Sequence, residues 1–512
     1  MTNKLEDFGQ LIYESIAGST SYGTNIEGSD LDIRGIFIPH RKFLVGLNNV
    51  DEFKDKDIDD IEYFSIQKFV SLAMEGNPNV VEQLFVKDEH VLFQNEFGKE
   101  LREMRKEFLT KNAYGRFGSY AFAQMKRLNS KNNGTHHGSH KDLIEKYGYD
   151  TKHAMHLVRL FQMGIQILSK HELDTFRPNR EELLSIRNGM YSLDEIKQYA
   201  EELNQQLEES MLVSKIPDYP DFDKINKWLV ETVDKAHGLN TMNGMFKGIT
   251  FNVLPLEYEM VDKCSILSVS NKLIRRKDES KASGIVVPYK DWFTGLRKFN
   301  SPFKFEETTI DSLHSVIKKA HQCDPKIIDI IYAKDKNILF EHPMAVEVRE
   351  KLSSMFTTKN TYHKAYNYAM GNLNKMKQWE RLKTQWNKDK IENSSLTEYP
   401  PVPKNTDPEN ASMMTKYGYD TLRAVNMVHT LNLAIELMRT GTIKDSRSHE
   451  PELYSIKHGS LSTFEEFEKY IQKLVSELNE AKSSSVLPEK YNFEEIENWV
   501  IDFVERFHSQ LD

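Results

Sequence analysis

The stretch "GSTSYGTNIEGSDLDIRG", residues 18–35, decides how the N-terminal part of this chain is interpreted. It combines glycines and small hydroxyl residues with two carboxylates, Asp30 and Asp32. The flanking runs, "LIYESIAGS" (11–19) and "LDIRGIFIP" (31–39), are rich in β-branched residues and bounded by Gly and Pro, which predicts strands. Because residues i and i+2 of a strand share a face, we expect Asp30 and Asp32 to project together.

The residue types in this stretch suit a metal and a phosphate. Adjacent carboxylates repel, and Mg²⁺ held by one or two carboxylates plus substrate phosphates relieves that cost. Gly18 and Ser19 follow a predicted strand and are expected to open a helix, where glycine lets the backbone approach a phosphate. Ser, Gly and Asp are also ordinary turn residues, so a plain turn is the alternative. The ligand spacing of an EF-hand calcium loop and its closing Glu are absent.

The chain repeats its motifs in the same order along its length. The clearest pairs are "RGIFIPHRKFLVGL" (34–47) with "SGIVVPYKDWFTGL" (283–296), "KYGYDTKHAMHLVRL" (146–160) with "KYGYDTLRAVNMVHT" (416–430), and "KINKWLVETVDKAH" (224–237) with "EIENWVIDFVERFH" (495–508). These pairs predict a tandem duplication of an α+β unit, each copy a small mixed sheet followed by a helical domain. The predicted domains are residues 1–107, 108–237, 238–350 and 351–512.

The composition is that of a globular protein that acts inside the cell. The 512 residues are 39% hydrophobic and 28% charged, which predicts about three or four compact units. No apolar run approaches the roughly 20 residues that cross a bilayer, so we expect no membrane contact. The acidic, polar N-terminus predicts no secretion signal, and two cysteines form no disulfide framework, so a cytoplasmic location is expected.

The net charge of −9 argues against non-specific duplex binding over the whole surface, yet it permits a local basic groove. Residues 119–152 gather several basic side chains. A solvated helix and loop is the alternative interpretation of that run.

Four segments resemble a known family. They are "GSTSYGTNIEGSDLDIRGIFIP" (18–39), "DDIEYFSIQKF" (59–69), "GNPNVVEQLF" (76–85) and "KHAMHLVRL" (152–160). Together they resemble the nucleotidyltransferases of the DNA polymerase beta superfamily and, more narrowly, the branch associated with RNA repair pathways. The resemblance covers residues 11 to about 237.

The resemblance implies the roles of particular residues. It implies catalytic carboxylates at Asp30 and Asp32 and a third at Asp60 or Glu62, with two Mg²⁺ ions held by Asp30, Asp32 and Asp60. The nucleotide-binding candidates are Gly18, Ser19, Tyr22, Gly23, Ser29, Arg34, Lys152, His156 and Arg159.

The last three of these residues lie at positions i, i+4 and i+7 of a predicted helix and so form one stripe. The stripe is interpreted as a clamp for phosphates, and a solvent-facing helix face is the alternative. Arg177 and Arg187 are further cationic candidates. Asn77 and Pro78 are expected to shape a helix turn, and Glu82 is a candidate for orienting one of the basic groups.

The second copy serves as an internal comparison. The counterparts are Leu267 for Gly18, Lys272 for Gly23, Glu279 for Asp30, Lys281 for Asp32, Ser283 for Arg34, Leu422 for Lys152, Asn426 for His156 and His429 for Arg159, while Asp60 and Glu62 fall near Glu307 and Thr309. Apolar and turn positions such as Pro39/Pro288 and Trp228/Trp499 are retained. The pattern predicts a C-terminal half that keeps the fold and is catalytically inactive. It is expected either to hold the acceptor or to pack as half of a pseudo-dimer.

The function predicted from these observations is Mg²⁺-dependent transfer of a nucleoside monophosphate from a nucleoside triphosphate to an acceptor hydroxyl, with release of pyrophosphate. The resemblance favours an RNA end as the acceptor. A protein or small-molecule acceptor uses the same machinery. A catalytically inactive protein that binds nucleic acid or a partner protein on this fold is the alternative from another class.

Overall fold

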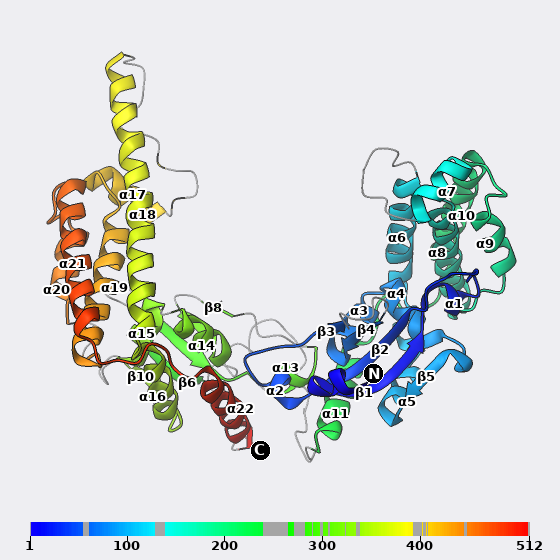
Figure 1. Cartoon of the computed structure of the whole chain (residues 1–512), viewed down its shortest axis with the longest axis horizontal. Coiled ribbons are helices and arrows are strands. Elements are labelled where there is room, and N and C mark those ends of the chain that lie inside the picture. The colour runs from blue at the N-terminus through cyan, green and yellow to red at the C-terminus, as the bar shows by residue number, and fades with distance from the viewer. Residues whose placement is uncertain are drawn as a thin grey trace. The chain divides into compact units, whose positions relative to one another are not determined.

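The computed structural model describes residues 2–54, 61–128, 139–238, 265–270, 282–288, 290–296, 301–305, 308–322, 324–333, 338–392, 402, 406, 408–444 and 448–509. The chain divides into two compact units (Figure 1). The first comprises Met1–Met245 with Lys290–Lys298, and the second comprises Phe246–Tyr289 with Phe299–Asp512. No helix in the described part of the chain has the length and apolar character that a membrane crossing needs.

The first unit begins with a five-stranded mixed sheet. Its strands are β1 (Gly9–Ile16), β2 (Ile33–Pro39), β3 (Glu52–Lys54), β4 (Ile61–Ser65) and β5 (Val91–Gln94), in the spatial order β3-β4-β2-β1-β5. Strands β2 and β4 are parallel, and the other neighbours are antiparallel. The short elements around the sheet are η1 (Thr2–Asp7), α1 (Gly18–Tyr22), α2 (Arg41–Leu44), α3 (Ile66–Met74), α4 (Pro78–Val81), η2 (Glu82–Phe85), η3 (Asp88–His90), α5 (Glu96–Glu103) and η4 (Arg105–Phe108).

Side-chain caps fix where the helices after β4 begin. The Ser65 side chain accepts a hydrogen bond from the backbone N–H of Lys68 at the start of α3. The Asn77 side chain accepts from the N–H of Asn79, and Pro78 occupies the first turn of α4. The expectation that Asn77 and Pro78 shape a helix turn is therefore confirmed.

The helical part of the first unit follows the sheet in the sequence. It contains α6 (Asn112–Leu128), α7 (Ser139–Tyr147), α8 (Thr151–Lys170), α9 (Arg180–Arg187), α10 (Leu193–Val213) and α11 (Phe222–Ala236). Helix α8 lies at its centre and packs against both α6 and α10. A side chain at Gly164 would place its Cβ 2.9 Å from Leu207 and 3.1 Å from Phe117, so the glycine permits this close helix packing.

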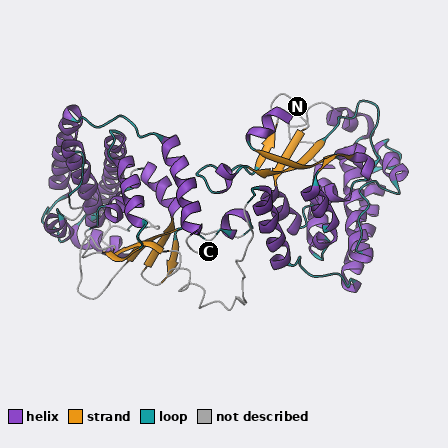
Figure 2. Cartoon of the chain, turned by 90° about the horizontal axis from the view of Figure 1, so that it is seen from below, coloured by secondary structure: helices purple, strands orange, loops and turns teal. Residues whose placement is uncertain are grey.

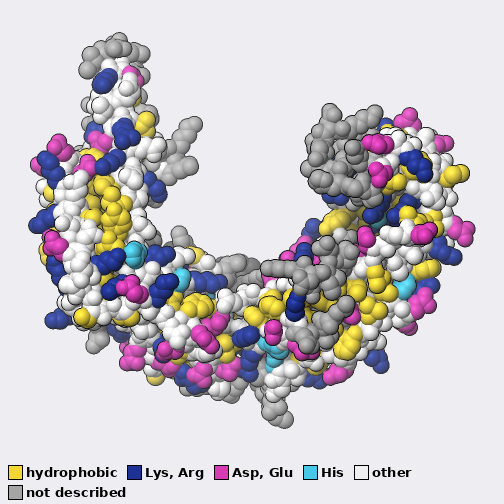
Figure 3. Space-filling model, viewed as in Figure 1, with side chains coloured by type: hydrophobic (Ala, Val, Ile, Leu, Met, Phe, Trp, Pro, Cys, Tyr) yellow, Lys and Arg dark blue, Asp and Glu magenta, His cyan; other side chains and the backbone are white. Residues whose placement is uncertain are grey.

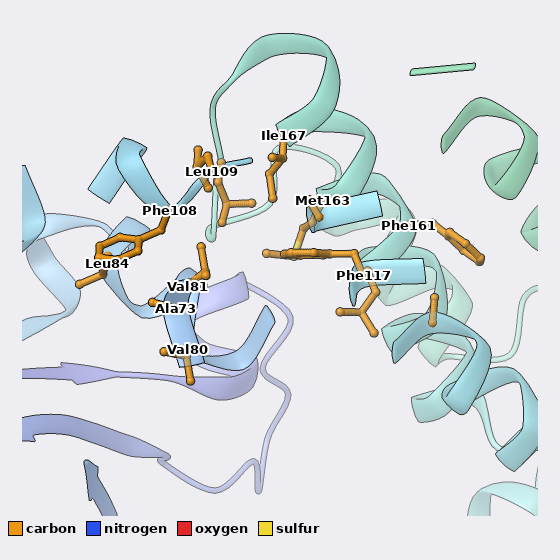
Figure 4. Packing of buried hydrophobic residues seen from close by; sticks show 14 of the residues in the cluster. Ala73, Val80, Val81, Leu84, Phe108, Leu109, Phe117, Phe161, Met163 and Ile167 are labelled. Atoms are coloured by element: carbon orange, nitrogen blue, oxygen red, sulfur yellow. The ribbon is translucent and has the colours of Figure 1, made fainter. Parts of the chain in front are cut away.

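One hydrophobic core joins the sheet to these helices. Ile36 and Ile38 of β2 belong to the same buried cluster as Phe69 of α3 and Phe161 of α8. Figure 4 shows Val80, Val81 and Leu84 below Phe108 and Leu109, with Phe117, Met163 and Ile167 alongside. In Figure 2, most helices of the first unit lie to one side of its sheet. The architecture is α+β, as the sequence predicts.

An aromatic cluster occupies the other face of the sheet. Phe8 lies 5.7 Å from Phe43 and 5.4 Å from Phe53, and Phe53 lies 6.1 Å from Tyr63, all between ring centroids. A side chain at Gly35 would place its Cβ 2.1 Å from the Tyr63 ring, so Gly35 makes room for this aromatic face.

The second unit also contains a five-stranded sheet. Its elements are β6 (Ser265–Ser270), β7 (Ala282–Val286), β8 (Phe303–Phe305), β9 (Thr308–Ser312), α14 (Leu313–His321), α15 (Pro325–Ile331), β10 (Ile338–Glu341), α16 (Ala345–Phe356), α17 (Asn360–Glu392), α18 (Pro408–Tyr417), α19 (Thr421–Thr440), α20 (Glu450–Lys457), α21 (Phe464–Ser484) and α22 (Phe493–Ser509). The order β10-β6-β7-β9-β8 and the parallel β7–β9 pair repeat the first sheet's topology. The His508 ring contacts the carbonyl of Pro288 at 2.8 Å, as the His237 ring contacts that of Pro39 at 3.0 Å. The tandem duplication itself stays a prediction.

One predicted boundary does not match the structure. Residues 290–298, expected within the domain 238–350, belong to the first unit, where α13 (Asp291–Thr294) packs on α11. Lys290 Nζ lies 3.0 Å from Asp234 Oδ2, and the Leu296 N–H donates to Asn226 Oδ1 at 2.7 Å. These polar contacts hold the segment on α11, an arrangement that sequence position alone does not reveal. The rest of the four-domain division stays a prediction.

Candidate functional site

The first feature of the site is the contact between Gly18 and Asp32. Helix α1 begins directly after β1, and Gly18 has φ +62°. A Cβ at Gly18 would lie 1.8 Å from Asp32 Oδ2, so only glycine lets this carboxylate approach the start of α1. The N–H of Ala17 donates to the carbonyl of Asp32 at 2.9 Å and closes the base of the intervening loop.

The two acids precede the strand rather than lying on it. The sequence predicts a strand from residue 31, but β2 begins at Ile33, so the alternation expected on a strand does not orient Asp30 and Asp32. Asp30 is exposed, and the Asp32 side chain retains 31% of its accessible surface. Ser29 shapes the turn before them, because its hydroxyl accepts from the Ile26 N–H at 2.9 Å and its own N–H donates to the Ile26 carbonyl at 3.0 Å.

Arg34 and Glu62 lie beside Asp32 on the two parallel strands. They face each other in the β2–β4 register, and Arg34 Nε lies 3.3 Å from Glu62 Oε2. Arg34 Nη2 is also 3.8 Å from Asp32 Oδ1. Lys54 Nζ lies 2.7 Å from Glu62 Oε1, and its hydrogen bond to Glu62 raises the pKa of Lys54. Glu62 is thus held between two cations.

The identity of a third carboxylate stays open. Asp60 lies outside the described residues. Within the described ranges, no group of three or more His, Cys, Asp or Glu side chains is arranged to hold a metal ion. The ion pairs of Glu62 with Arg34 and Lys54 compete with any metal for its oxygens.

Two residues predicted to bind the nucleotide are buried instead. The Tyr22 side chain is 5% exposed and that of Arg159 is 3% exposed. The Tyr22 hydroxyl donates to Glu82 Oε1, and Arg159 Nη1 donates to Glu82 Oε2 at 2.8 Å. The prediction that Tyr22 and Arg159 contact the nucleotide is therefore not supported by their environment, because both already have protein partners away from solvent. Glu82, which was expected to orient a basic group, pairs with Arg159.

Lys152 and His156 remain accessible on the same helix. Both are partly exposed. Burial, followed by the charges of Arg159, Lys152, His153 and Arg187, holds the pKa of His156 well below its usual value. The ring is therefore neutral at neutral pH.

Arg187 ties this basic group to the loop after α1. Its Nη1 donates to the carbonyl of Thr24 at 3.3 Å, and partial burial lowers its pKa. The charges of Lys152 and Arg187 both contribute to the lowered pKa of His156. In Figure 3, basic and acidic side chains intermingle over the face shown.

Arg177 and Gly23 have structural partners. Arg177 is 4% exposed and donates to Gln166 Oε1 at 2.8 Å, and burial followed by the charge of Arg159 lowers its pKa to about 10. Gly23 has φ +75°, and a Cβ there would lie 2.8 Å from the Phe176 ring. The positions that sequence reasoning missed, Phe176 and Lys54, reach the site from distant segments, and no local pattern marks them.

These features point to a class of protein. A mixed sheet whose first strand leads into a Gly-Ser helix turn, with an acidic pair before the next strand and basic residues on α8, resembles that of the polymerase beta-like nucleotidyltransferases. Residues 3–231 match the RNA repair pathway DNA polymerase beta family, RlaP. The resemblance stated from the sequence is thus confirmed for this part of the chain.

Two further proteins are similar to parts of the chain. A 113-residue segment is 31% identical to an uncharacterized 38.9 kDa protein from the nrdC-mobD intergenic region of Enterobacteria phage T4, covering 20% of this chain and 34% of that protein. The match therefore spans about a third of the length of the phage protein. The crystal structure of a nucleotidyltransferase-like protein from Exiguobacterium sibiricum 255-15 matches 46% of this chain and 76% of its own, at 9% identity and a TM-score of 0.18.

Proposed function

We propose that the first unit transfers a nucleoside monophosphate from a nucleoside triphosphate to an acceptor hydroxyl. The acceptor oxygen forms a bond to the α-phosphorus, the bond to the bridging oxygen breaks, and pyrophosphate leaves while the hydroxyl proton passes to solvent. The observation that carries the proposal is the contact between Gly18 and Asp32, since it places a carboxylate against the start of α1. The family match supports an RNA end as the acceptor.

The acidic residues fit Mg²⁺. Asp30 and Asp32 supply carboxylate oxygens, which this cation prefers. When bound, the metal would supply charge neutralisation and activation of the acceptor hydroxyl. Glu62 fits poorly because Arg34 and Lys54 already neutralise it. Asp60 is kept as the proposed third ligand.

The basic side chains of α8 and α9 are proposed to hold the phosphates. Lys152 and Arg187 supply positive charge. The neutral His156 ring supplies either a donor or an acceptor between them, according to its tautomer. Gly18 and Ser19 are proposed to approach the phosphates through the backbone. The second unit, whose sequence replaces Asp30 by Glu279 and Asp32 by Lys281, is proposed to be inactive.

The test is label transfer from each of the four nucleoside triphosphates, with Mg²⁺, to cellular RNA and protein fractions that are then resolved. Asp32→Asn should reduce transfer by more than the roughly 10–100-fold that loss of an outer-shell metal partner costs. Asp88→Asn is the matched control, because this exposed carboxylate pairs only at the surface, with Arg102. The proposal fails if the wild-type protein labels neither fraction, or if Asp32→Asn and Asp88→Asn transfer equally well.

A further inference from the structure

A buried polar cluster connects α1 to the helical part of the first unit. We name it the Glu82 cluster, comprising Tyr22, Glu82 and Arg159. Glu82 accepts hydrogen bonds from Tyr22 on one oxygen and from Arg159 on the other, and the Arg159 guanidinium lies 3.6 Å from the centre of the Tyr22 ring. The three residues are 5%, 5% and 3% exposed. Burial, the largest influence, raises the pKa of Tyr22, so its hydroxyl stays protonated and donates.

The cluster joins three elements that are far apart in the sequence. Tyr22 is the last residue of α1, Glu82 begins η2, and Arg159 lies in the middle of α8. The backbone around it is tied as well, because Thr175 Oγ1 donates to the Glu82 carbonyl at 2.7 Å and the Arg177 N–H donates to the Tyr22 carbonyl at 3.0 Å. Helix α1 has five residues and no side-chain N-cap, so it depends on such tertiary contacts.

The two ends of the proposed active site are attached to this cluster. Gly18, at the other end of α1 from Tyr22, contacts the Asp32 carboxylate. His156 and Lys152 lie about one and two turns before Arg159 on α8. We propose that Glu82 is a positioning residue, which fixes the acidic end of the site relative to its basic end through Tyr22 and Arg159. This inference rests on the proposed nucleotidyl transfer.

A buried ion pair is by itself weak evidence for a contribution to stability. Well-packed apolar residues often replace a buried ion pair without loss of stability. In the repeated motifs of the second half, Asp329 corresponds to Glu82 and His429 to Arg159, so a shorter carboxylate and a histidine stand at these two positions. Position 429 is still buried, at 1% exposure, while Pro78 and Trp228 keep their counterparts Pro325 and Trp499.

The test separates positioning from stability. Tyr22→Phe removes one hydrogen bond to Glu82 and keeps the ring against Arg159. We expect amide hydrogen exchange in Gly18–Tyr22 to accelerate by at least about tenfold, with kcat lowered about 10–100-fold and the KM for the nucleotide changed little. Glu82→Gln, which keeps the shape and loses the charge, should act in the same direction.

The second unit offers a matched control. Glu347 also accepts from an aromatic donor and an arginine, Trp499 Nε1 at 2.6 Å and Arg506 Nη2 at 2.7 Å. Glu347→Gln should leave both the exchange of α1 and the transfer reaction unchanged.

An apolar replacement of the ion pair separates the two roles, because a purely structural role predicts that transfer recovers when stability is restored. In the double variant Glu82→Leu/Arg159→Met, transfer should remain low even where the thermal midpoint equals that of the wild type. Restored transfer in this variant, or wild-type exchange of α1 in both Tyr22→Phe and Glu82→Gln, would overturn the positioning role. If the wild-type protein transfers no nucleotide, the proposed function fails, and the positioning role fails with it, while faster exchange of α1 in Tyr22→Phe would still show the structural coupling.

Discussion

The substitution Gly18→Ala tests the contact at the centre of the proposed site. The new Cβ would lie 1.8 Å from Asp32 Oδ2 and 2.8 Å from its Cγ, so the carboxylate must turn away. The backbone at φ +62° adds about 1–2 kcal/mol, the cost of the left-handed conformation for a residue with a Cβ. Because a carboxylate can rotate, the fold should survive with a midpoint about 2–8 °C lower, while the proposed ligand is displaced. We expect transfer to fall by about 100-fold.

Gly28→Ala is the matched control in the same loop. Gly28 has φ +79°, and no atom lies within 4 Å of a Cβ built there. The two variants therefore bear the same backbone cost, and only Gly18→Ala meets Asp32. Thermal unfolding and label transfer, measured on both, separate these effects. Equal transfer by the two variants would refute the reasoning that the approach of Asp32 to Gly18 is needed for the reaction.

Two other predictions concern stability. In the unfolded chain, histidines titrate near pH 6.5, whereas in the folded protein the pKa values of His156 and His237 are lowered. Below about pH 6.5 the unfolded state therefore binds more protons than the folded state. The free energy of unfolding should fall as the pH drops through this range. Urea unfolding at pH 7.5 and 5.5 should show a smaller loss for His156→Gln than for the wild type, and an equal loss would contradict the assignment. Asn77→Ala removes the cap of α4 and should cost about 1 kcal/mol without altering transfer, and a lowered kcat at an unchanged midpoint would show instead that Asn77 acts in the site.

The first two strands of the sheet and the central helices were predictable because their signals are local. β-branched runs bounded by Gly and Pro indicated β1 and β2, and the spacing of Ile66, Phe69 and Val70 matches the buried face of α3. The placement of residues 290–298 was not predictable, because it depends on contacts with Asn226 and Asp234 far away in the sequence.

The basic stripe shows that a helix pattern predicts which residues share a face but not how deeply each of them is buried. Positions i, i+4 and i+7 share a face, but the depth of that face changes along α8. Lys152 and His156 lie where the helix is partly exposed, whereas Arg159 reaches the core beside Met163, to whose sulfur its Nη1 donates at 3.2 Å. The same pattern therefore includes two candidate phosphate ligands, Lys152 and His156, and a buried residue, Arg159. The hydrogen bond of Arg159 to Glu82 identifies it as the buried one.

The opening motif was predicted from its residue types, and the structure supplies the reason for its spacing. Gly18 and Asp32 are separated by a loop whose base is closed by the hydrogen bond from Ala17 to Asp32, so two parts of the motif meet in space. The sequence suggested that Gly18 lets a phosphate approach the backbone. In the structure, the atom nearest to the position of a Cβ at Gly18 is Oδ2 of Asp32. A side chain at position 18 would therefore displace the Asp32 carboxylate from the start of α1.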